Sequence, residues 1–299
     1  MGDFSLNILL YVFFIVPDWS EELKGKHRLL MDIVRLGEKM DIGFAFPTQT
    51  LHLFNEQKSM IEKINSDQIF KDFISRIKDK EIKKLWIEHP GIKKKFFDFI
   101  YNDIVNIDKP NILEFGVRHG CSTALFLDIC NQNDGHLYSI DINDYSYKFK
   151  DERWKFICSK DNDLIKITPQ IPNEFEVIFL DTIHKADHVN DIIYKYYDKL
   201  KIGGFFIIDD TSWLPYIRGG KHDDFFKEVN NKETFSKLLE IYSSNLGKFY
   251  LDINFCDTGA AKITKINNEK LNDASQLLSR EFSIKNLIRR LVYNLKKNK

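Results

Sequence analysis

Acidic residues and a histidine stand at the ends of two apolar segments of the sequence. The segment FEVIFLD ends at Asp181, and His184 follows three residues later. A second segment, FFIIDD, ends in Asp209 and Asp210. If both segments are parallel strands of one sheet, their carboxyl ends line the same crevice, and the three carboxylates meet the imidazole there. Carboxylates without counter-charges repel one another, and a hard divalent cation such as Mg²⁺ would relieve that repulsion through oxygen ligands.

A glycine-containing turn provides the second set of candidate residues. The string EFGVRHGCS runs from Glu114 to Ser122. Gly116 and Gly120 let the backbone turn tightly and approach a ligand, and the helix expected from about Ser122 presents free N–H groups. Asp141 ends the next apolar segment, about twenty residues further on, where a carboxylate can accept both hydroxyls of a ribose. The glycine spacing differs from the G-x-G-x-x-G of dinucleotide-binding proteins.

The elements that must position these residues alternate between strand and helix patterns from residue 110 onward. Strands are expected over 111–117, 136–142, 154–159, 175–181, 205–210, 248–255 and 260–265, and helices over about 122–130, 186–200 and 223–242. This alternation predicts an α/β domain with a mostly parallel, Rossmann-like sheet that is covered on both faces and closed by an antiparallel C-terminal hairpin.

These motifs resemble those of a known enzyme family over about residues 110–265. Glu114-x-Gly116-x-x-x-Gly120 looks like motif I of class I methyltransferases, which holds the methionine portion of S-adenosylmethionine (SAM). The Asp-x-x-His after the fourth strand and the acidic pair after the fifth resemble the metal-dependent O-methyltransferases of the macrocin O-methyltransferase and cephalosporin-hydroxylase type. The resemblance implies a class I methyltransferase domain that uses SAM and Mg²⁺ or a similar divalent cation.

The resemblance also implies roles for individual residues. Asp181, Asp209 and Asp210 would be metal ligands, and His184 would be the general base. The family often has Glu-Asp where this chain has Asp209-Asp210, and the shorter first carboxylate could weaken or reposition the ion. Asp161 stands where the family carries its adenine-side Asp. The implied cofactor-binding residues are Glu114, Gly116, Gly120, Ser122, Asp141 and Asp161.

The expected reaction is methyl transfer from SAM to a hydroxyl of a sugar or small glycosylated acceptor. A metal ion lowers the pKa of a coordinated hydroxyl, and a nearby neutral histidine can take its proton. Trp213, Tyr216 and Arg218 follow the acidic pair and could line the acceptor pocket, because aromatic faces stack on sugar rings. They could equally anchor a loop.

Plainer interpretations stay open for the same residues. His184 could begin a helix without a catalytic role, and Asp209 and Asp210 could cap a loop. The enzyme could also be a metal-independent methyltransferase that acts on another acceptor, such as a nitrogen or a carboxylate.

The first 55 residues carry a different resemblance. A strand over 4–16, a helix from Trp19 to about Met40 and an extended run over 43–53 predict a small α+β fragment. The string FAFPTQT resembles the end of the cytosolic C-terminal domain of small-conductance mechanosensitive channels. A non-enzymatic, channel-derived accessory or assembly protein is therefore an alternative function. Residues 56–109, which are charged and helical in pattern, are expected to be a linker and lead-in.

Residues 266–299 are expected to end in a basic amphipathic helix. Six basic residues and no acidic ones lie between Lys285 and Lys299. Such a helix can lie on an anionic membrane surface, or it can dock on the core of its own or a partner chain. Its apolar stripe consists of Ile284, Leu287, Ile288, Leu291, Val292 and Leu295.

The charge, the length of the apolar runs and the cysteine spacing bear on the class of protein. The 44 basic and 44 acidic residues give a net charge of zero, which argues against a general nucleic-acid-binding protein. The apolar run over 5–16 is shorter than the roughly 20 residues that span a bilayer. The cysteines lack paired short spacing and are expected to be reduced and buried. We expect a cytoplasmic protein with a small-molecule or carbohydrate substrate and no nucleic-acid partner, which could form homo-oligomers or contact a membrane peripherally.

Overall fold

The computed structural model describes residues 19–39, 67–212, 225–278 and 283–297. The chain divides into two compact units, Met1–Met60 and Ile61–Lys299. In the first unit, helix α1 (Trp19–Lys39) confirms the helix expected from the sequence. The strands expected over 4–16 and 43–53 lie outside the described residues.

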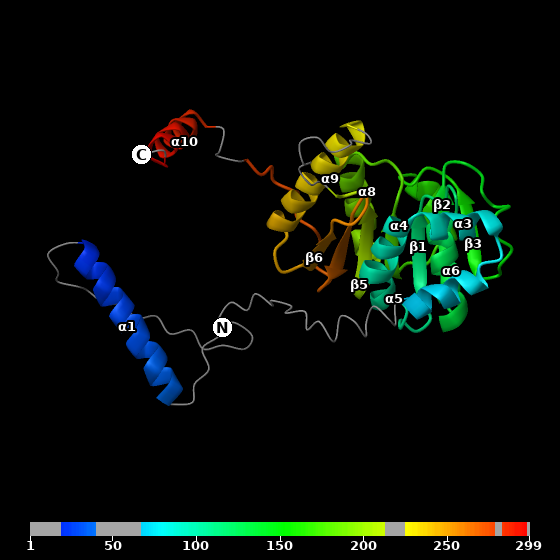
Figure 1. Ribbon diagram of the computed structural model, residues 1–299. Helices are drawn as coiled ribbons and strands as arrows, with labels where there is room; N and C mark the ends of the chain where they lie inside the picture. Colours follow the sequence, from blue (N-terminus) through cyan, green and yellow to red (C-terminus); the bar gives the residue numbers. More distant parts are fainter. Residues whose placement is uncertain (1–18, 40–66, 213–224, 279–282, 298–299) are drawn as a thin grey trace. The chain divides into compact units, whose positions relative to one another are not determined.

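The second unit is built on a sheet that, within the described residues, has seven strands in the order β3-β2-β1-β4-β5-β7-β6. β1 to β5 run parallel, whereas β7 pairs antiparallel with both β5 and β6 (Figure 1). The predicted class I methyltransferase fold, with its antiparallel C-terminal hairpin, is confirmed. The strands are β1 (Asn111–Phe115), β2 (His136–Asp141), β3 (Trp154–Cys158), β4 (Phe175–Leu180), β5 (Leu200–Asp209), β6 (Phe249–Asn254) and β7 (Ala260–Lys265).

Strand β1 lies where the order of the strands along the sheet reverses. Leu113 on β1 pairs with Tyr138 on β2 at one side and with Ile178 on β4 at the other. In open α/β sheets a crevice forms at the carboxyl ends of the strands beside such a switch point. The glycine turn after β1 and the acidic residues after β4 therefore fall at one edge of the sheet.

One face of the sheet is covered by α7 (Leu164–Ile167), α8 (Ala186–Tyr196) and α9 (Phe225–Ser244). The buried residues of α8 recur at helical spacing, which fixes the face that it turns to the sheet. The ring of Tyr196 on α8 contacts the ring of Phe115 on β1, with 4.7 Å between centroids. This contact packs the end of α8 against β1, while His188 lies in the first turn of the helix and His184 just before it.

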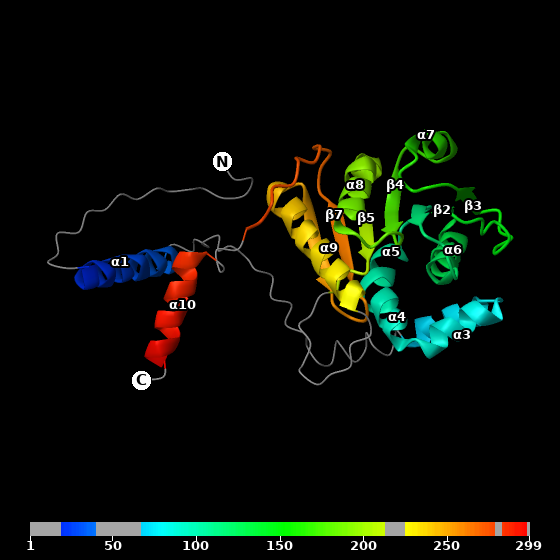
Figure 2. The same ribbon diagram turned by 90° about the horizontal axis from the view of Figure 1, so that it is seen from above.

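The opposite face is covered by α6 (Cys121–Asn133) and by helices that precede the sheet in the sequence. The rings of Phe73, Phe96 and Phe97 surround Trp86, with centroid distances of 5.2, 5.5 and 5.8 Å. Figure 2 shows α3 beside α6. Residues 67–104, expected as part of a lead-in, thus contribute to the domain core. These helices are the helical residues 67–76, α3 (Lys80–Glu88), α4 (Pro90–Lys95), a π-helical turn (Phe96–Tyr101) and α5 (Asn102–Ile104).

Strand β5 differs from its prediction in where it begins. The strand was expected over 205–210, after two glycines, but it begins at Leu200 and ends at Asp209. Its pairing with β4 shifts register between Phe175 and Val177, and Gly203 has a φ of 79°. Because glycine tolerates this left-handed conformation, the glycines form an irregularity inside the strand instead of preceding it.

The cysteines also differ in part from their prediction. Cys130 is buried, but Cys158 and Cys256 are exposed, and all four cysteines are free thiols. The prediction that they are buried is therefore wrong for two of them, because each of these two lies at or just beyond the end of a strand, near the surface. Within the described ranges, no helix is both long and apolar enough to cross a membrane.

Candidate active site

The glycine turn after β1 depends on the missing side chain of Gly116. This residue has a φ of 95°, and a Cβ atom there would lie 2.0 Å from the backbone oxygen of Asp181. Gly120, with a φ of 85°, precedes α6, and a Cβ atom on it would meet the ring of Phe149 at 3.0 Å. The predicted tight turn is present. Because Gly116 has no Cβ, the backbone of Asp181, which directly follows β4, can pass close to it.

Glu114 lies beneath this turn in a fully buried cage of hydroxyl groups. Its two carboxylate oxygens accept hydrogen bonds from Ser122 Oγ at 2.7 Å, Thr123 Oγ1 at 2.8 Å and Ser139 Oγ at 2.6 Å. Burial raises the pKa of Glu114 to about 7, although the three hydroxyl donors oppose that rise. The side chains of Glu114 and Ser122, expected to bind the cofactor, therefore bond to each other and support the turn. Sequence reasoning missed Thr123 and Ser139.

Asp141 is placed at the turn by backbone donors. Its Oδ2 accepts hydrogen bonds from the N–H groups of Val117 at 2.8 Å and Arg118 at 3.4 Å. The carboxylate lines a cavity of about 590 Å³ at the carboxyl ends of β1, β2 and β4. Five of the predicted site residues line this cavity, whereas Glu114, Gly120, Ser122, Asp209 and Asp210 do not. Members of its lining include Gly116, Asp141, Asp161, Asp181, His184 and His188.

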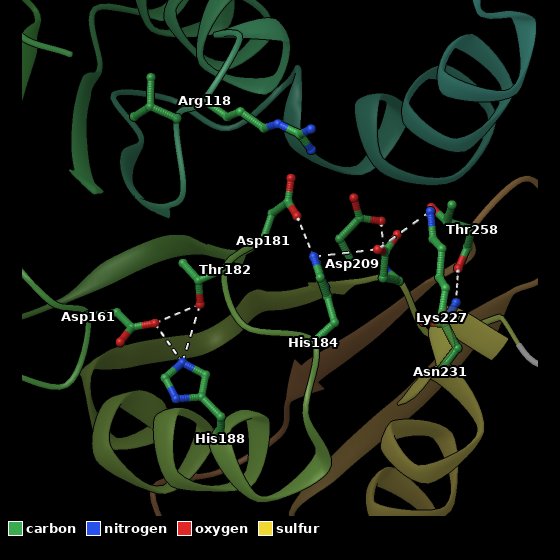
Figure 3. A network of polar contacts seen from close by, with 12 residues as sticks. Arg118, Asp161, Asp181, Thr182, His184, His188, Asp209, Lys227, Asn231 and Thr258 are labelled. Atoms are coloured by element: carbon green, nitrogen blue, oxygen red, sulfur yellow. Dashed lines mark hydrogen bonds and ion pairs between the residues drawn. The ribbon is translucent and has the colours of Figure 1, made fainter. Parts of the chain in front are cut away.

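Asp161 also lines this cavity, and two side chains contact the same oxygen of its carboxylate. Thr182 Oγ1 donates to Asp161 Oδ2 at 2.6 Å, and His188 Nε2 lies 2.7 Å from that oxygen (Figure 3). Ser159, which lines the same cavity, has a buried Oγ without a partner among the described residues. The sequence placed His188 one helical turn past His184, but it gave no sign of the contact with Asp161.

His184 joins the two acidic segments. Its Nε2 lies 3.5 Å from Asp181 Oδ1 and 3.4 Å from Asp210 Oδ2. Figure 3 shows the imidazole reaching the end of β5 from the loop after β4. Asp210 takes a positive φ of 56° immediately after β5, which redirects the chain at this point. The predicted convergence of the histidine with the carboxylates is present for Asp181 and Asp210.

Asp209 is instead held by a buried lysine that sequence reasoning missed. Lys95 Nζ lies 2.5 Å from Asp209 Oδ1 and 3.0 Å from Thr258 Oγ1. The side chains of Lys95 and Asp209 are only 5% and 9% exposed. Lys95 follows two other lysines at the end of α4, so the sequence reads as a solvated basic run.

The electrostatics of the site show an excess of negative charge. The pKa of Asp181 is raised well above its usual value by burial and by the neighbouring charges of Asp209 and Asp210. Burial also raises the pKa of Asp209, and the ammonium group of Lys95 opposes that rise. Burial by itself lowers the pKa of Lys95, but the charges of Asp209, Asp210 and Asp181 outweigh it and leave this pKa raised. Lys95 and Lys227, whose Nζ lies 3.9 Å from Asp210 Oδ2, thus face three carboxylates.

The donor set can be tested against the predicted divalent cation. Within the described ranges, no group of three or more His, Cys, Asp or Glu side chains is close enough to hold a metal ion. Mg²⁺, however, is commonly held by one or two carboxylates together with water and substrate oxygens. Asp181 and Asp210 fit that requirement. Asp209 does not contribute in this structure, because its carboxylate already pairs with Lys95.

The three residues predicted to contact the acceptor, Trp213, Tyr216 and Arg218, lie outside the described residues. The structure therefore describes the cavity at the carboxyl ends of β1, β2 and β4 and the region around His184, while the acceptor pocket stays a prediction from the sequence.

Comparison with known proteins identifies the domain. Residues 113–211 match the family model described as a methyltransferase domain. This range includes the glycine turn, Asp141, Asp161 and both acidic segments. The chain thus carries a methyltransferase domain, and the prediction of a methyltransferase is confirmed at that level. Residues 1–55 lie outside the match, so their resemblance to a channel fragment has no support here.

Solved structures with a related fold include MycE, a methyltransferase of the mycinamycin biosynthetic pathway, in complex with Mg and S-adenosylhomocysteine (SAH). It is 20% identical, with a TM-score of 0.45, and the alignment covers 60% of this chain and 52% of MycE. This chain thus aligns with about half the length of MycE. The SAH-bound methyltransferase PaMTH1 of Podospora anserina is 12% identical, with coverage of 76% and 100% and a TM-score of 0.43. These distant similarities carry no argument about substrate or metal. No curated protein matches the sequence.

Proposed function

We propose that this chain is a SAM-dependent O-methyltransferase that acts on a hydroxyl of a sugar or small glycosylated acceptor, with His184 as general base. One observation carries the proposal. His184 Nε2 lies within 3.5 Å of Asp181 and 3.4 Å of Asp210, at the wall of a cavity that also contains Asp141 and Asp161. A base, a charge-stabilising carboxylate pair and a nucleoside-sized cavity therefore adjoin one another.

The cofactor would lie along the carboxyl ends of β1, β2 and β4. Asp141 would accept ribose hydroxyls, and Asp161 and Ser159 line the same cavity. SAM, when bound, supplies a methyl group on a sulfonium centre. The glycine turn keeps side chains away from this part of the cavity, since Gly116 has no Cβ.

A divalent cation would be held by Asp181 and Asp210, with Asp209 neutralised by Lys95. When bound, such an ion supplies a positive charge that lowers the pKa of a coordinated hydroxyl. The surplus of carboxylates over cationic side chains at this edge of the sheet supports the assignment, as does their hard oxygen chemistry.

His184 performs the proton step in this proposal. An alcohol is a weak nucleophile because it holds its proton tightly, so the reaction needs a base within hydrogen-bonding reach of the hydroxyl. His184 Nε2 would take that proton, and the oxygen would use the released electron pair to form the new bond to the methyl carbon. The bond from that carbon to the sulfonium sulfur would break at the same time, and its electron pair would stay on the sulfur, which leaves as part of SAH. The carboxylates of Asp181 and Asp210 then stabilise the imidazolium, since both lie beside Nε2.

The test is methyl transfer from isotope-labelled SAM to a panel of methyl glycosides and sugar nucleotides, followed by mass spectrometry of products and of released SAH. His184→Asn should lower kcat by about 10²–10⁴-fold, the usual contribution of a general base. His136→Asn is the matched control, because His136 is exposed at the opposite end of the strands. SAH binding, measured by calorimetry, should be unchanged in both variants.

Each outcome decides a different part of the proposal. Normal turnover of His184→Asn would remove its role as base. Full activity in the presence of EDTA would exclude the proposed role of the metal ion. A product methylated on nitrogen would show that the acceptor is an amine and not a hydroxyl. Failure of the wild-type chain to bind SAH would overturn the proposal as a whole.

A second candidate is a metal-independent methyltransferase, and Lys95 favours it. The ammonium group already supplies a buried cation 2.5 Å from Asp209, in a position that a metal ion could otherwise occupy. Calorimetry with Mg²⁺ in the presence of SAH separates the two candidates, since only the first predicts heat from metal binding that Asp181→Asn removes.

A further inference from the structure

Helix α10 (Ile284–Lys297) carries an apolar stripe whose described side chains are exposed. Among its described residues, Ile284, Leu287, Ile288 and Leu291 are 79%, 43%, 56% and 64% exposed. These positions recur at intervals of three and four residues, so they form one stripe along the helix. Within the described residues, no α10 side chain belongs to either of the two core clusters. An isolated apolar stripe of this kind requires another partner.

Basic residues lie on both sides of the stripe. At about 100° per residue, Lys285 lies about 60° beyond one edge of the stripe and Arg290 about 60° beyond the other. Arg289 lies on the same flank as Lys285, and its Nη1 donates to Asn286 Oδ1 at 3.3 Å. From residue 283 to the last residue the chain has six basic residues and no acidic one. The helix therefore combines an apolar stripe with two cationic borders.

We propose that α10 binds the surface of an anionic lipid bilayer, with its apolar stripe in the acyl-chain boundary and its basic residues at the lipid phosphates. Long basic side chains can keep their charges at headgroup level while the neighbouring leucines are buried. Charge argues for lipid over a second copy of the same helix. Two α10 helices packed by their stripes would bring together twelve basic side chains, six from each copy, and like charges repel one another.

The purified full-length chain tests this proposal by co-sedimentation with vesicles. One set of vesicles is equimolar phosphatidylcholine and phosphatidylglycerol, and the other is phosphatidylcholine alone. Binding to the anionic vesicles should be about ten-fold or more tighter. It should weaken in 1 M salt, because the screening length falls from about 8 Å at physiological salt to about 3 Å.

Paired variants separate the stripe from the rest of the helix. Leu287→Gln with Leu291→Gln should lower vesicle binding about ten-fold or more, because it removes apolar contact without changing charge. The control combines Asn286→Gln with Tyr293→Gln on the opposite side of the helix, and it should bind as the wild type does. SAH binding should be the same in all variants, which shows that the methyltransferase domain is folded.

Three results would overturn the proposal. The first is no binding to anionic vesicles, and the second is equal binding by the two leucine substitutions and by their control. The third is a dimer in sedimentation velocity that the leucine substitutions abolish, without vesicle binding, which would assign the stripe to a second copy. None of these results bears on the proposed methyltransferase activity.

Discussion

Substitution of Lys95 by methionine tests the buried ion pair at the centre of the site. Methionine keeps most of the apolar volume of the lysine stem but removes the ammonium group. Asp209 would then be a buried carboxylate whose nearest remaining donor is the backbone N–H of Asp210, 2.9 Å from Oδ1. Asp209 would also keep its repulsive neighbours Asp181 and Asp210, since both raise the electrostatic cost of a charge there.

The expected loss can be bounded from the geometry. Removing one partner of a buried ion pair typically costs about 3–5 kcal/mol, because the other charge stays buried without compensation. Because Asp209 keeps the backbone hydrogen bond, we expect Lys95→Met to lower the unfolding free energy by about 3 kcal/mol, the lower end of that range. Asp209→Asn in the same chain should recover much of this loss, because the double variant contains neither charge.

Urea denaturation followed by circular dichroism measures the effect. Lys94→Met is the matched control: Lys94 is exposed on the same helix, so its substitution should change the unfolding free energy by less than about 0.5 kcal/mol. If Lys95→Met lost no more stability than Lys94→Met, or if Asp209→Asn failed to rescue it, the ion pair would not have the importance assigned to it here.

Four further substitutions, one of them a control, test the turn and the cavity. Gly116→Ala should destabilise the domain far more than the control Gly203→Ala. A Cβ atom at residue 203 would meet no other atom, so that substitution should cost only the roughly 1–2 kcal/mol of a left-handed non-glycine residue. Equal midpoints of the two variants in thermal melts would contradict this prediction. Because burial raises the pKa of Glu114 from 4.5 to about 7, the wild-type unfolding free energy should fall by about 3 kcal/mol between those pH values. The unfolding free energy of Glu114→Gln, measured by urea titration, should not show that fall. If the wild type and Glu114→Gln had parallel profiles of unfolding free energy against pH, the prediction would be wrong. His188→Ala removes one donor to Asp161 and should weaken SAH binding about ten-fold in calorimetry, with an unchanged dissociation constant as the contrary result.

Much of the fold could be predicted because its signals are local. Apolar runs mark the strands from β1 to β4 and the C-terminal hairpin, and the runs of β1, β2 and β4 end in glycine or aspartate. β5 was harder, because Gly203 resembles a boundary while it in fact bends the strand from within. The helices over 67–104 were expected to be a lead-in, since charged residues interrupt their apolar pattern. Their buried aromatic residues are recognisable only once the sheet that they cover is known.

The positions of those site residues that directly follow a strand could be predicted from the sequence. Asp141, Asp181 and Asp210 lie at the carboxyl ends of their strands, as parallel topology requires. Contacts between distant segments gave no such signal. Lys95 approaches Asp209 from a separation of 114 residues. In the same way, the carboxylate of Glu114 looked like a ligand for the cofactor, because nothing in its own segment shows that Ser139 would reach it from β2.

A crystal structure of the full chain with SAH and Mn²⁺ tests the central claim most directly. We expect SAH in the cavity between Asp141 and Asp161, with its sulfur toward His184, and the ion on Asp181 and Asp210. SAH bound elsewhere, or a well-ordered cavity without SAH at saturating concentration, would contradict the assignment of this edge of the sheet as the methyl-transfer site. An ion coordinated by Asp209 in place of Lys95 would contradict the division of the carboxylates between lysine and metal.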